Sequence, residues 1–318
     1  MDVVSDAISA VRVGRPSSDR VRVGGRWCAR FDPYDGAGFH VVLRGGCWLL
    51  PDGGEPVVLG AGDAVLLPHG TGHVIADSPA DAAAVARAVS FERWALHPRP
   101  PRPAPGAREV EMLCGKYRLD RTRAHPLLAE LPPLVHLPAR AGAHPELRAA
   151  IGLLEGELDE RRPGASLALP SLLDLLFVYM IRSWTAESTA GAWPAALGDR
   201  VAAAALRALH ADPAAAALRA LPAARAAPWP VARPAAAAGV SRPTLARRFT
   251  ALVGRPPMAY LAWWRLTRAA ALLRDTGDPL AAVARRVGYG SPYALSHAFR
   301  REFGMTPGQY RAGITTGG

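Results

Sequence analysis

One pattern occurs twice near the C-terminal end of the chain, fifty residues apart, and it constrains the fold more than any other feature. The two copies read "PAAAAGVSRPTLARRFTALVG" (234–254) and "PLAAVARRVGYGSPYALSHAFRREFG" (279–304). In each copy an apolar helical pattern meets a glycine turn, a serine can cap the next helix, and that helix ends at a glycine. Helix, short turn and helix form a helix-turn-helix motif, so the sequence predicts an all-α domain with two such motifs joined by a helix over 256–275. The corresponding positions are Ser241 and Ser291, Leu245 and Leu295, Phe249 and Phe299, and Gly254 and Gly304.

Positive charge is concentrated in the same part of the chain. Residues 198–318 hold 17 arginines and five acidic residues, whereas the first 197 residues hold 21 basic and 22 acidic ones. One explanation is an ordinary solvated surface in a protein that uses arginine in place of lysine, since Lys116 is the only lysine. Arginine also binds phosphate and guanine through paired hydrogen bonds. Together with the repeat, the charge favours double-stranded DNA as a partner, and residues 198–318 alone are predicted to bind it.

The N-terminal part has a different periodicity. Between about residues 20 and 120, apolar runs such as "GAGFHVVLRGGCWLL" alternate with Gly, Pro and Asp about every ten residues, which is typical of antiparallel strands in a barrel or sandwich. The apolar period then becomes helical over residues 147–158 and 172–184. The predicted fold class is therefore α+β. The predicted domains are 1–137 (β-barrel), 138–197 (linking helices, for packing or dimerisation) and 198–318 (all-α).

The cysteines and the apolar runs bear on the compartment. Cys28, Cys47 and Cys114 are widely spaced and odd in number, which argues against a disulfide framework. No run of eighteen uncharged apolar residues occurs, and the N-terminus lacks a basic-then-apolar signal pattern. We therefore expect a soluble cytoplasmic protein with no membrane partner.

The stretch "AAVARRVGYGSPYALSHAFRREFGMTPGQYR" (281–311) carries a resemblance to a known family. Over about residues 229–311 the chain resembles the DNA-binding domain of the AraC/XylS family of bacterial transcription regulators. The resemblance implies two recognition helices that enter successive major grooves on one face of the DNA. It also implies that RNA polymerase is a partner. A homodimer through residues 147–158 and 172–184 would read two half-sites.

By motif position, the resemblance assigns DNA contacts to the start of each recognition helix. Proline and alanine donate no hydrogen bond, which leaves Arg247 and His297 as the expected base-reading residues, although many members carry arginine where this chain has His297. Phosphate contacts and solvated charge are equal alternatives for Arg242, Arg248, Arg300 and Arg301. The assigned residues are Ser241, Arg242, Pro243, Ala246 and Arg247 in the first helix, and Ser291, Pro292, Tyr293, Ala294 and His297 in the second.

Three segments have no clear counterpart. Pro234 stands where the family has leucine, so the helix before the first recognition helix either starts there or is weakened. An alanine-rich insertion precedes Trp229, and a proline-rich loop occupies residues 98–108.

The segment "GDAVLLPHGTGH" (62–73) resembles the second motif of the cupin domain, a sensor that often precedes the AraC-type domain. The first cupin motif is half present, because Val42 replaces its second histidine and Cys47 stands in its glutamate position. The resemblance therefore implies a ligand site made by His40, Cys47 and His73, which Cys114 could join. Imidazole and thiolate together suit zinc, so zinc is the cofactor to test, although none is required. Alternatively, the histidines bond backbone groups and the cysteines are small buried hydrophobes, or one cysteine senses oxidants.

Three functions compete. The preferred one is a sequence-specific DNA-binding transcriptional regulator, not an enzyme, whose cupin domain senses a small molecule, a metal or a redox signal. The second is a metal-dependent cupin enzyme fused to a DNA-binding domain, which the missing histidine and glutamate disfavour. The third is an architectural DNA-binding protein with a degenerate barrel.

Overall fold

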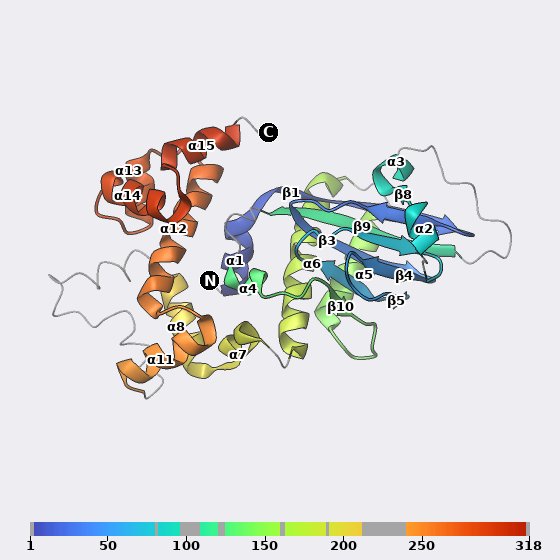
Figure 1. The fold of residues 1–318 in the computed structure, drawn as a ribbon, viewed down its shortest axis with the longest axis horizontal. Helices are drawn as coiled ribbons and strands as arrows, with labels where there is room; N and C mark the ends of the chain where they lie inside the picture. Colours follow the sequence, from blue (N-terminus) through green and yellow to red (C-terminus); the bar gives the residue numbers. More distant parts are fainter. Residues whose placement is uncertain are drawn as a thin grey trace. The chain divides into compact units, whose positions relative to one another are not determined.

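The structure, a computed structural model, shows two compact units (Figure 1). The sheet unit contains Arg12–Ala124 and Leu131–Glu187, and the helical unit contains Met1–Val11, His125–Glu130 and Ser188–Gly318. The described residues are 3–79, 82–95, 109–119, 125–159, 163–188, 191–211 and 240–315. The proline-rich loop 98–108, Pro234 and the alanine-rich insertion before Trp229 lie outside them.

Two five-stranded sheets form the described part of the sheet unit. Their strand orders are β1-β9-β3-β6-β10 and β5-β4-β7-β2-β8. The predicted β-rich N-terminal domain is confirmed, and its described strands form two sheets rather than one closed barrel. The strands are β1 (Arg12–Gly24), β2 (Cys28–Phe31), β3 (Gly36–Arg44), β4 (Gly46–Pro51), β5 (Val57–Gly60), β6 (Ala64–Leu67), β7 (His73–Ala76), β8 (Val89–Ser90), β9 (Glu109–Leu119) and β10 (Val135–Leu137). Two short helices, α2 (Ala82–Ala86) and α3 (Phe91–Ala95), flank β8.

The core of the sheet unit lies between the two sheets. Val42 and Met112 from the first sheet pack with Leu49 and Ile75 from the second. Most of β3 is buried, which explains why its sequence is an unbroken apolar run rather than an alternating one. Because successive side chains point to opposite faces of a strand, one face of β3 lies in this core and the other is turned away from it.

Two helices cover the outer face of the first sheet. α5 (Pro145–Asp159) and α6 (Ala165–Glu187) pack together, and α6 also contacts β1 and β10. The Tyr117 ring on β9 stacks on Phe177 of α6 at 4.5 Å, and its hydroxyl donates to the Leu173 carbonyl. The predicted linking helices therefore exist, but they belong to the sheet unit.

α6 is the one helix among the described residues that is long and apolar enough to cross a membrane. A core helix passes the same test. One side of α6 buries Leu176, Phe177 and Met180, whereas Leu167 and Leu175 are exposed on the other.

The helical unit gathers three separate parts of the chain. The N-terminal helix contacts α4, α8 and α12, and its buried residues Ala7, Ile8 and Val11 face them. The division therefore differs from the predicted boundaries at residues 137 and 197, because apolar packing brings residues 3–11, 125–130 and 192–198 into the helical unit. Its helices are α1 (Val3–Val11), α4 (Pro126–Ala129), α7 (Ala192–Gly198), α8 (Arg200–Ala211), α11 (Arg242–Val253), α12 (Pro257–Asp275), α13 (Leu280–Arg286), α14 (Pro292–Phe303) and α15 (Pro307–Thr315).

A chain of hydrogen bonds, here called the helical-unit histidine chain, joins these three parts. The Leu127 amide donates to Nδ1 of His125, so the neutral His125 ring must donate from Nε2 to the Tyr260 hydroxyl, 3.0 Å away. The Tyr260 hydroxyl then donates to Nε2 of His210 at 2.8 Å. His210 in turn donates from Nδ1 to the Asp6 carboxylate at 2.9 Å.

Aromatic rings enclose this chain. His210 stacks on Trp264 at 4.2 Å, and the His125 ring contacts Trp193 at 5.0 Å. His125, His210 and Tyr260 have no exposed surface. The chain therefore satisfies buried polar groups in a packed core.

The predicted repeat is confirmed in the geometry of its helices. Ser241 caps α11 by accepting from the Thr244 amide, and Ser291 caps α14 by accepting from the Ala294 amide. Gly254 and Gly304 end the two helices in the left-handed conformation, with φ of 77° and 73°. α13 and α14 form a complete helix-turn-helix motif, whereas the helix predicted before α11 lies outside the described residues.

Candidate functional site

The residues assigned to DNA lie at the exposed starts of α11 and α14. Leu245 and Phe249 in α11, like Leu295 and Phe299 in α14, turn inward and are buried. Because buried positions recur every four residues, the remaining faces of both helices point to solvent. The exposed assigned residues are Ser241, Arg242, Pro243, Arg247, Pro292, Tyr293, Ala294 and His297, whereas Ala246 and Ser291 are partly buried.

The structure distinguishes a paired arginine from an unpaired one at the start of α11, which the sequence alone could not do. Nη2 of Arg248 lies 3.1 Å from the Asp199 carboxylate, so its charge is paired within the helical unit. Arg247, its neighbour, is exposed and has no salt bridge to any described residue. Arg247 is therefore the better placed of the two for a base or phosphate contact.

Tyr293 stands out on α14. The residue is 81% exposed, so its ring and hydroxyl are accessible to a partner. Its equivalent on α11 by the offset of fifty is Pro243, so the two recognition helices present different surfaces.

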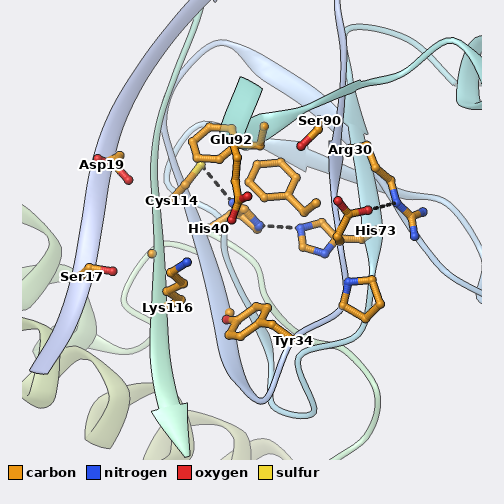
Figure 2. A pocket seen from close by; sticks show the side chains of 16 residues that line it. Ser17, Asp19, Arg30, Tyr34, His40, His73, Ser90, Glu92, Cys114 and Lys116 are labelled. Atoms are coloured by element: carbon orange, nitrogen blue, oxygen red, sulfur yellow. Dashed lines mark hydrogen bonds and ion pairs between the residues drawn. The ribbon is translucent and has the colours of Figure 1, made fainter. Parts of the chain in front are cut away.

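A cavity of about 280 Å³ lies in the sheet unit, here called the sheet-unit cavity (Figure 2). Strand register explains which side chains reach it: His40 on β3 pairs with Cys114 on β9, and Phe31 on β2 pairs with His73 on β7. The cavity lining therefore draws on both sheets. Its residues are Ser17, Asp19, Arg30, Phe31, Asp32, Pro33, Tyr34, Gly38, His40, His73, Ser90, Phe91, Glu92, Cys114, Gly115 and Lys116.

Two histidines and a thiol on the cavity wall form a second hydrogen-bonded chain, the sheet-unit histidine chain. Nδ1 of His73 lies 3.0 Å from the Thr71 carbonyl, which can only accept, so this nitrogen carries the proton. Nε2 of His73 then accepts from Nε2 of His40 at 2.8 Å. The remaining nitrogen of His40, Nδ1, accepts from the Cys114 thiol, whose sulfur is 3.1 Å away.

Burial keeps the members of this chain uncharged. Desolvation lowers the pKa of His73 to about 4; the Thr71 carbonyl and the Asp52 carboxylate partly offset this effect, whereas Arg30 adds to it. Desolvation, and then the neighbouring His73, hold the pKa of His40 well below its ordinary value. Desolvation raises the pKa of the Cys114 thiol well above its ordinary value. Both rings and the thiol are therefore neutral at pH 7.

Cys47 does not line the cavity. It is buried in the apolar core between the sheets, and desolvation raises its pKa to about 12. Neither Cys47 nor Cys114 thus has the lowered thiol pKa that makes a cysteine reactive. Cys28 is partly buried, and desolvation also raises its pKa.

The four residues predicted to hold zinc do not form a shared site. Cys114 and His73 contact opposite nitrogens of the His40 ring, so one ion cannot bind all three side chains in this arrangement. Among the described residues no group of three or more His, Cys, Asp or Glu is placed to hold a metal ion. The predicted metal set is therefore corrected to a hydrogen-bonded pair of histidines with one thiol.

The sequence missed much of the cavity. Tyr34, Lys116, Phe31 and Phe91 line it, yet none belongs to a cupin motif. Of these four residues, only Lys116 had a feature in the sequence that could have drawn attention to it, because it is the single lysine of the chain.

The fold and these sites define a class of protein: a cupin-type β-sandwich with an internal cavity, followed by tandem helix-turn-helix motifs. The cupin family matches residues 2–186, and the helix-turn-helix domain family matches residues 235–313. The chain belongs to the AraC-like transcription regulators and is a DNA-binding regulator of transcription.

Two relatives of full length support this membership, and a solved structure is similar to part of the chain. The chain is 36% identical over 314 residues to an AraC-like transcription regulator of Streptomyces lividans, covering 98% of both chains. It is 35% identical over 319 residues to one of Streptomyces antibioticus, again covering 98% of both. It is similar, at 32% identity and a TM-score of 0.30, to the solved DNA-binding domain of AdpA in complex with a target DNA, covering 37% of this chain and 95% of that one.

Proposed function

We propose that this regulator reads a specific DNA sequence through α11 and α14 and that a small molecule in the sheet-unit cavity controls that binding. The observation that supports the sensing role is the cavity wall itself, where His40 and His73 are neutral, ordered and adjacent to about 280 Å³ of space. A polar, oriented group beside apolar rings is the usual composition of a small-molecule site.

The sensing role is tested on DNA selected by the full chain from a random pool. His73→Ala removes a cavity residue that lies outside the helical unit, so affinity for the selected DNA should stay within about twofold. The response of that affinity to the effector should be lost. If the DNA affinity of His73→Ala still responds normally to the effector, His73 has only a structural role.

The same selected DNA tests which residues read bases. Arg247→Ala should lose about 1–3 kcal/mol on the selected site and less on random DNA, because a bidentate contact to a base discriminates between sequences. Arg248→Ala is the matched control, since its guanidinium is already paired with Asp199. Equal losses on both DNAs would make Arg247 a phosphate contact.

Tyr293 and His297 are proposed to contact the second half of the site. Tyr293→Ala should weaken binding to the selected DNA, because an exposed aromatic ring can pack on a thymine methyl and its hydroxyl can bond phosphate. The roles of Ser241, Arg242, Pro243, Ala246, Ser291, Pro292 and Ala294 at the DNA surface are proposed on position alone.

We further propose that the regulator acts in the cytoplasm as a homodimer and contacts RNA polymerase. Leu153 on α5 and Leu167 on α6 are 58% and 74% exposed, which suits an apolar contact with a second copy. Leu153→Glu combined with Leu167→Glu should convert a dimer to a monomer in sedimentation at micromolar concentration. A wild-type monomer would contradict this part of the proposal.

The alternative of a cupin enzyme lacks support in the site. The sheet-unit histidine chain contains no carboxylate, and its Cys114 thiol is neutral. A turnover assay with added Fe(II) or Mn(II) on candidate substrates separates the two functions.

A further inference from the structure

The turn between α13 and the second recognition helix, α14, is closed by backbone hydrogen bonds. The Gly288 amide donates to the Arg285 carbonyl at 3.1 Å. The Tyr289 amide donates to the Ala284 carbonyl at 2.8 Å. With a φ of 78° at Gly288, these bonds form the Schellman ending of a helix. The carbonyl of Val287, the residue at which α13 ends, accepts instead from a side chain of another helix.

That side chain is Arg265, on α12. Its Nε donates to the Val287 carbonyl, and its guanidinium lies over the Tyr289 ring with Cζ 4.1 Å from the ring centre. A guanidinium over the face of an aromatic ring is attracted by the negative charge of the π electrons. One side chain of α12 therefore holds both ends of residues 287–289.

The surroundings of Arg265 make this contact stiff. Desolvation lowers the pKa of Arg265 from its ordinary value, and the neighbouring Tyr289 opposes this effect. The guanidinium stays charged, as it does throughout folded proteins. A partly buried charge is costly unless polar groups replace the water that it has lost, and the Val287 carbonyl and the Tyr289 ring do so here. Moving the turn away from α12 would remove both groups from the charge.

The held turn leads directly into the DNA-facing end of α14. Only Gly290 stands between Tyr289 and Ser291, which caps α14 by accepting from the Ala294 amide at 3.1 Å. Tyr293, one of the residues proposed to contact DNA, comes two positions after that cap. A displacement of Tyr289 is therefore passed to the start of the recognition helix within one helical turn.

The first recognition helix has no equivalent ring. Gly239 occupies the position of Tyr289 fifty residues earlier, and glycine has no side chain on which a guanidinium can stack. α11 is joined to the rest of the helical unit by a different contact, the ion pair of Arg248 with Asp199 at 3.1 Å. Loss of the Arg265 contact should therefore affect α14 and leave α11 in place.

We propose that Arg265 is a positioning residue for DNA recognition: through the Val287 carbonyl and the Tyr289 ring it sets how α14 meets the base pairs, without touching DNA itself. This inference rests on the proposed reading of DNA by α14. A phosphate contact and a positioning residue have different signatures. Loss of a phosphate contact weakens binding to all sequences alike, whereas a displaced recognition helix loses its preference for the bases that it reads.

The test measures the affinity of the full chain for the selected DNA and for each single base-pair change in it. Bases whose changes no longer matter in His297→Ala are those read by α14, and Arg247→Ala identifies those read by α11. In the wild type, a changed base pair should cost about fivefold or more in affinity. In Arg265→Met the cost at the bases of α14 should fall below about twofold, while the cost at the bases of α11 stays as it was.

Substitutions of the ring test the same contact from its other side. Tyr289→Leu should reproduce the loss of base preference, whereas Tyr289→Phe, which keeps the ring, should not. Arg265→Met combined with Tyr289→Leu should lose no more than either change alone, because both remove one contact. Arg268→Met is the matched control: it removes an arginine three residues further along α12 and should leave every base preference unchanged.

The outcomes separate this inference from the proposed function. An equal loss on all sequences in Arg265→Met, with a weaker dependence on salt, would make Arg265 a phosphate contact. Unchanged costs at the bases of α14 in folded Arg265→Met or Tyr289→Leu would overturn the positioning role and leave α14 as a reading helix. Unaltered base preferences in both Tyr293→Ala and His297→Ala would overturn the reading by α14 and this inference with it. Circular dichroism verifies that each variant is folded, and Tyr289→Leu decides the matter if Arg265→Met is not.

Discussion

The molecule contains two chains of hydrogen bonds built on paired histidines, one in each unit, and their surroundings differ. The helical-unit histidine chain runs from the Leu127 amide through His125, Tyr260 and His210 to Asp6. Aromatic rings close around it, and every polar group in it has a partner. The sheet-unit histidine chain is as well ordered, but it forms part of a cavity wall.

This difference is the basis on which we propose a structural role for the first chain and a binding role for the second. In the helical unit, the chain ties together α1, α4, α8 and α12, so its free energy supports the fold. In the sheet unit, the chain lies in the lining of a cavity of about 280 Å³, which also includes Tyr34, whose hydroxyl no described residue bonds. We therefore propose different purposes for similar histidine pairs, which the identity of the residues alone does not distinguish.

The largest expected effect follows from removing parts of the helical unit. A fragment of residues 198–318 lacks α1, residues 125–130 and α7, so the buried faces of α8, α11 and α12 lose partners. We now expect this fragment to lose cooperative unfolding and most of its DNA affinity, contrary to the prediction from charge and motifs alone. Denaturant unfolding followed by circular dichroism measures this, and a cooperative, DNA-binding fragment would show that the added segments are dispensable.

A matched pair of tyrosine substitutions sharpens the comparison next. Tyr260→Phe leaves the buried nitrogens of His125 and His210 without partners, at a cost of about 1–3 kcal/mol for each group. Tyr34→Phe removes a buried hydroxyl that no described residue bonds, so the free energy of unfolding should not decrease. Urea denaturation measures the free energy of unfolding of both variants. Similar losses of stability in the two would contradict the proposed difference between the two networks.

The pH dependence of stability gives a smaller effect. The folded protein holds the pKa of His73 at about 4, below the unfolded value of about 6.5, so the unfolded state binds the proton first as pH falls. Stability is therefore complete above pH 6.5 and decreases by up to about 1.4 kcal/mol per pH unit down to pH 4. Among the groups that face this ring, Arg30 also disfavours its charge, whereas the Thr71 carbonyl and Asp52 favour it, and His40 is hydrogen-bonded to its Nε2.

His73→Gln removes this titration and should flatten that slope. The measurement is the free energy of unfolding at several pH values between 4 and 7. His40 and His125, whose pKa values are also lowered, keep part of the slope in the variant. An unchanged slope in His73→Gln would mean that His73 is not buried neutral.

Local patterns allowed much of this fold to be predicted. The serine caps and terminal glycines of α11 and α14 depend on residues a few positions apart, and they were predicted together with the repeat. The alternating strands and the two linking helices were also predictable from periodicity. His40 and His73 were predicted to share a site because both occupy motif positions, and the structure places them 2.8 Å apart.

Contacts between distant segments could not be predicted in the same way. Whether Cys47 faces the cavity or the core depends on strand register, and the structure puts it in the core. The membership of α1 in the helical unit depends on packing between residues about 200 positions apart, such as Asp6 and His210. The proximity of Lys116 to Tyr34 likewise depends on pairing between β3 and β9.

The most direct test of the different roles of the two histidine chains is one nuclear magnetic resonance titration. The full chain, labelled with ¹⁵N in its histidine rings and assigned by single His→Gln variants, is titrated with 2-naphthol, a neutral planar molecule used as a probe of the sheet-unit cavity. We predict that the ring nitrogens of His40 and His73 shift with the probe, whereas those of His125 and His210 stay fixed. Shifts at His125 and His210 that match those at His40 and His73, or no shift at His40 and His73 while calorimetry detects binding, would contradict the account.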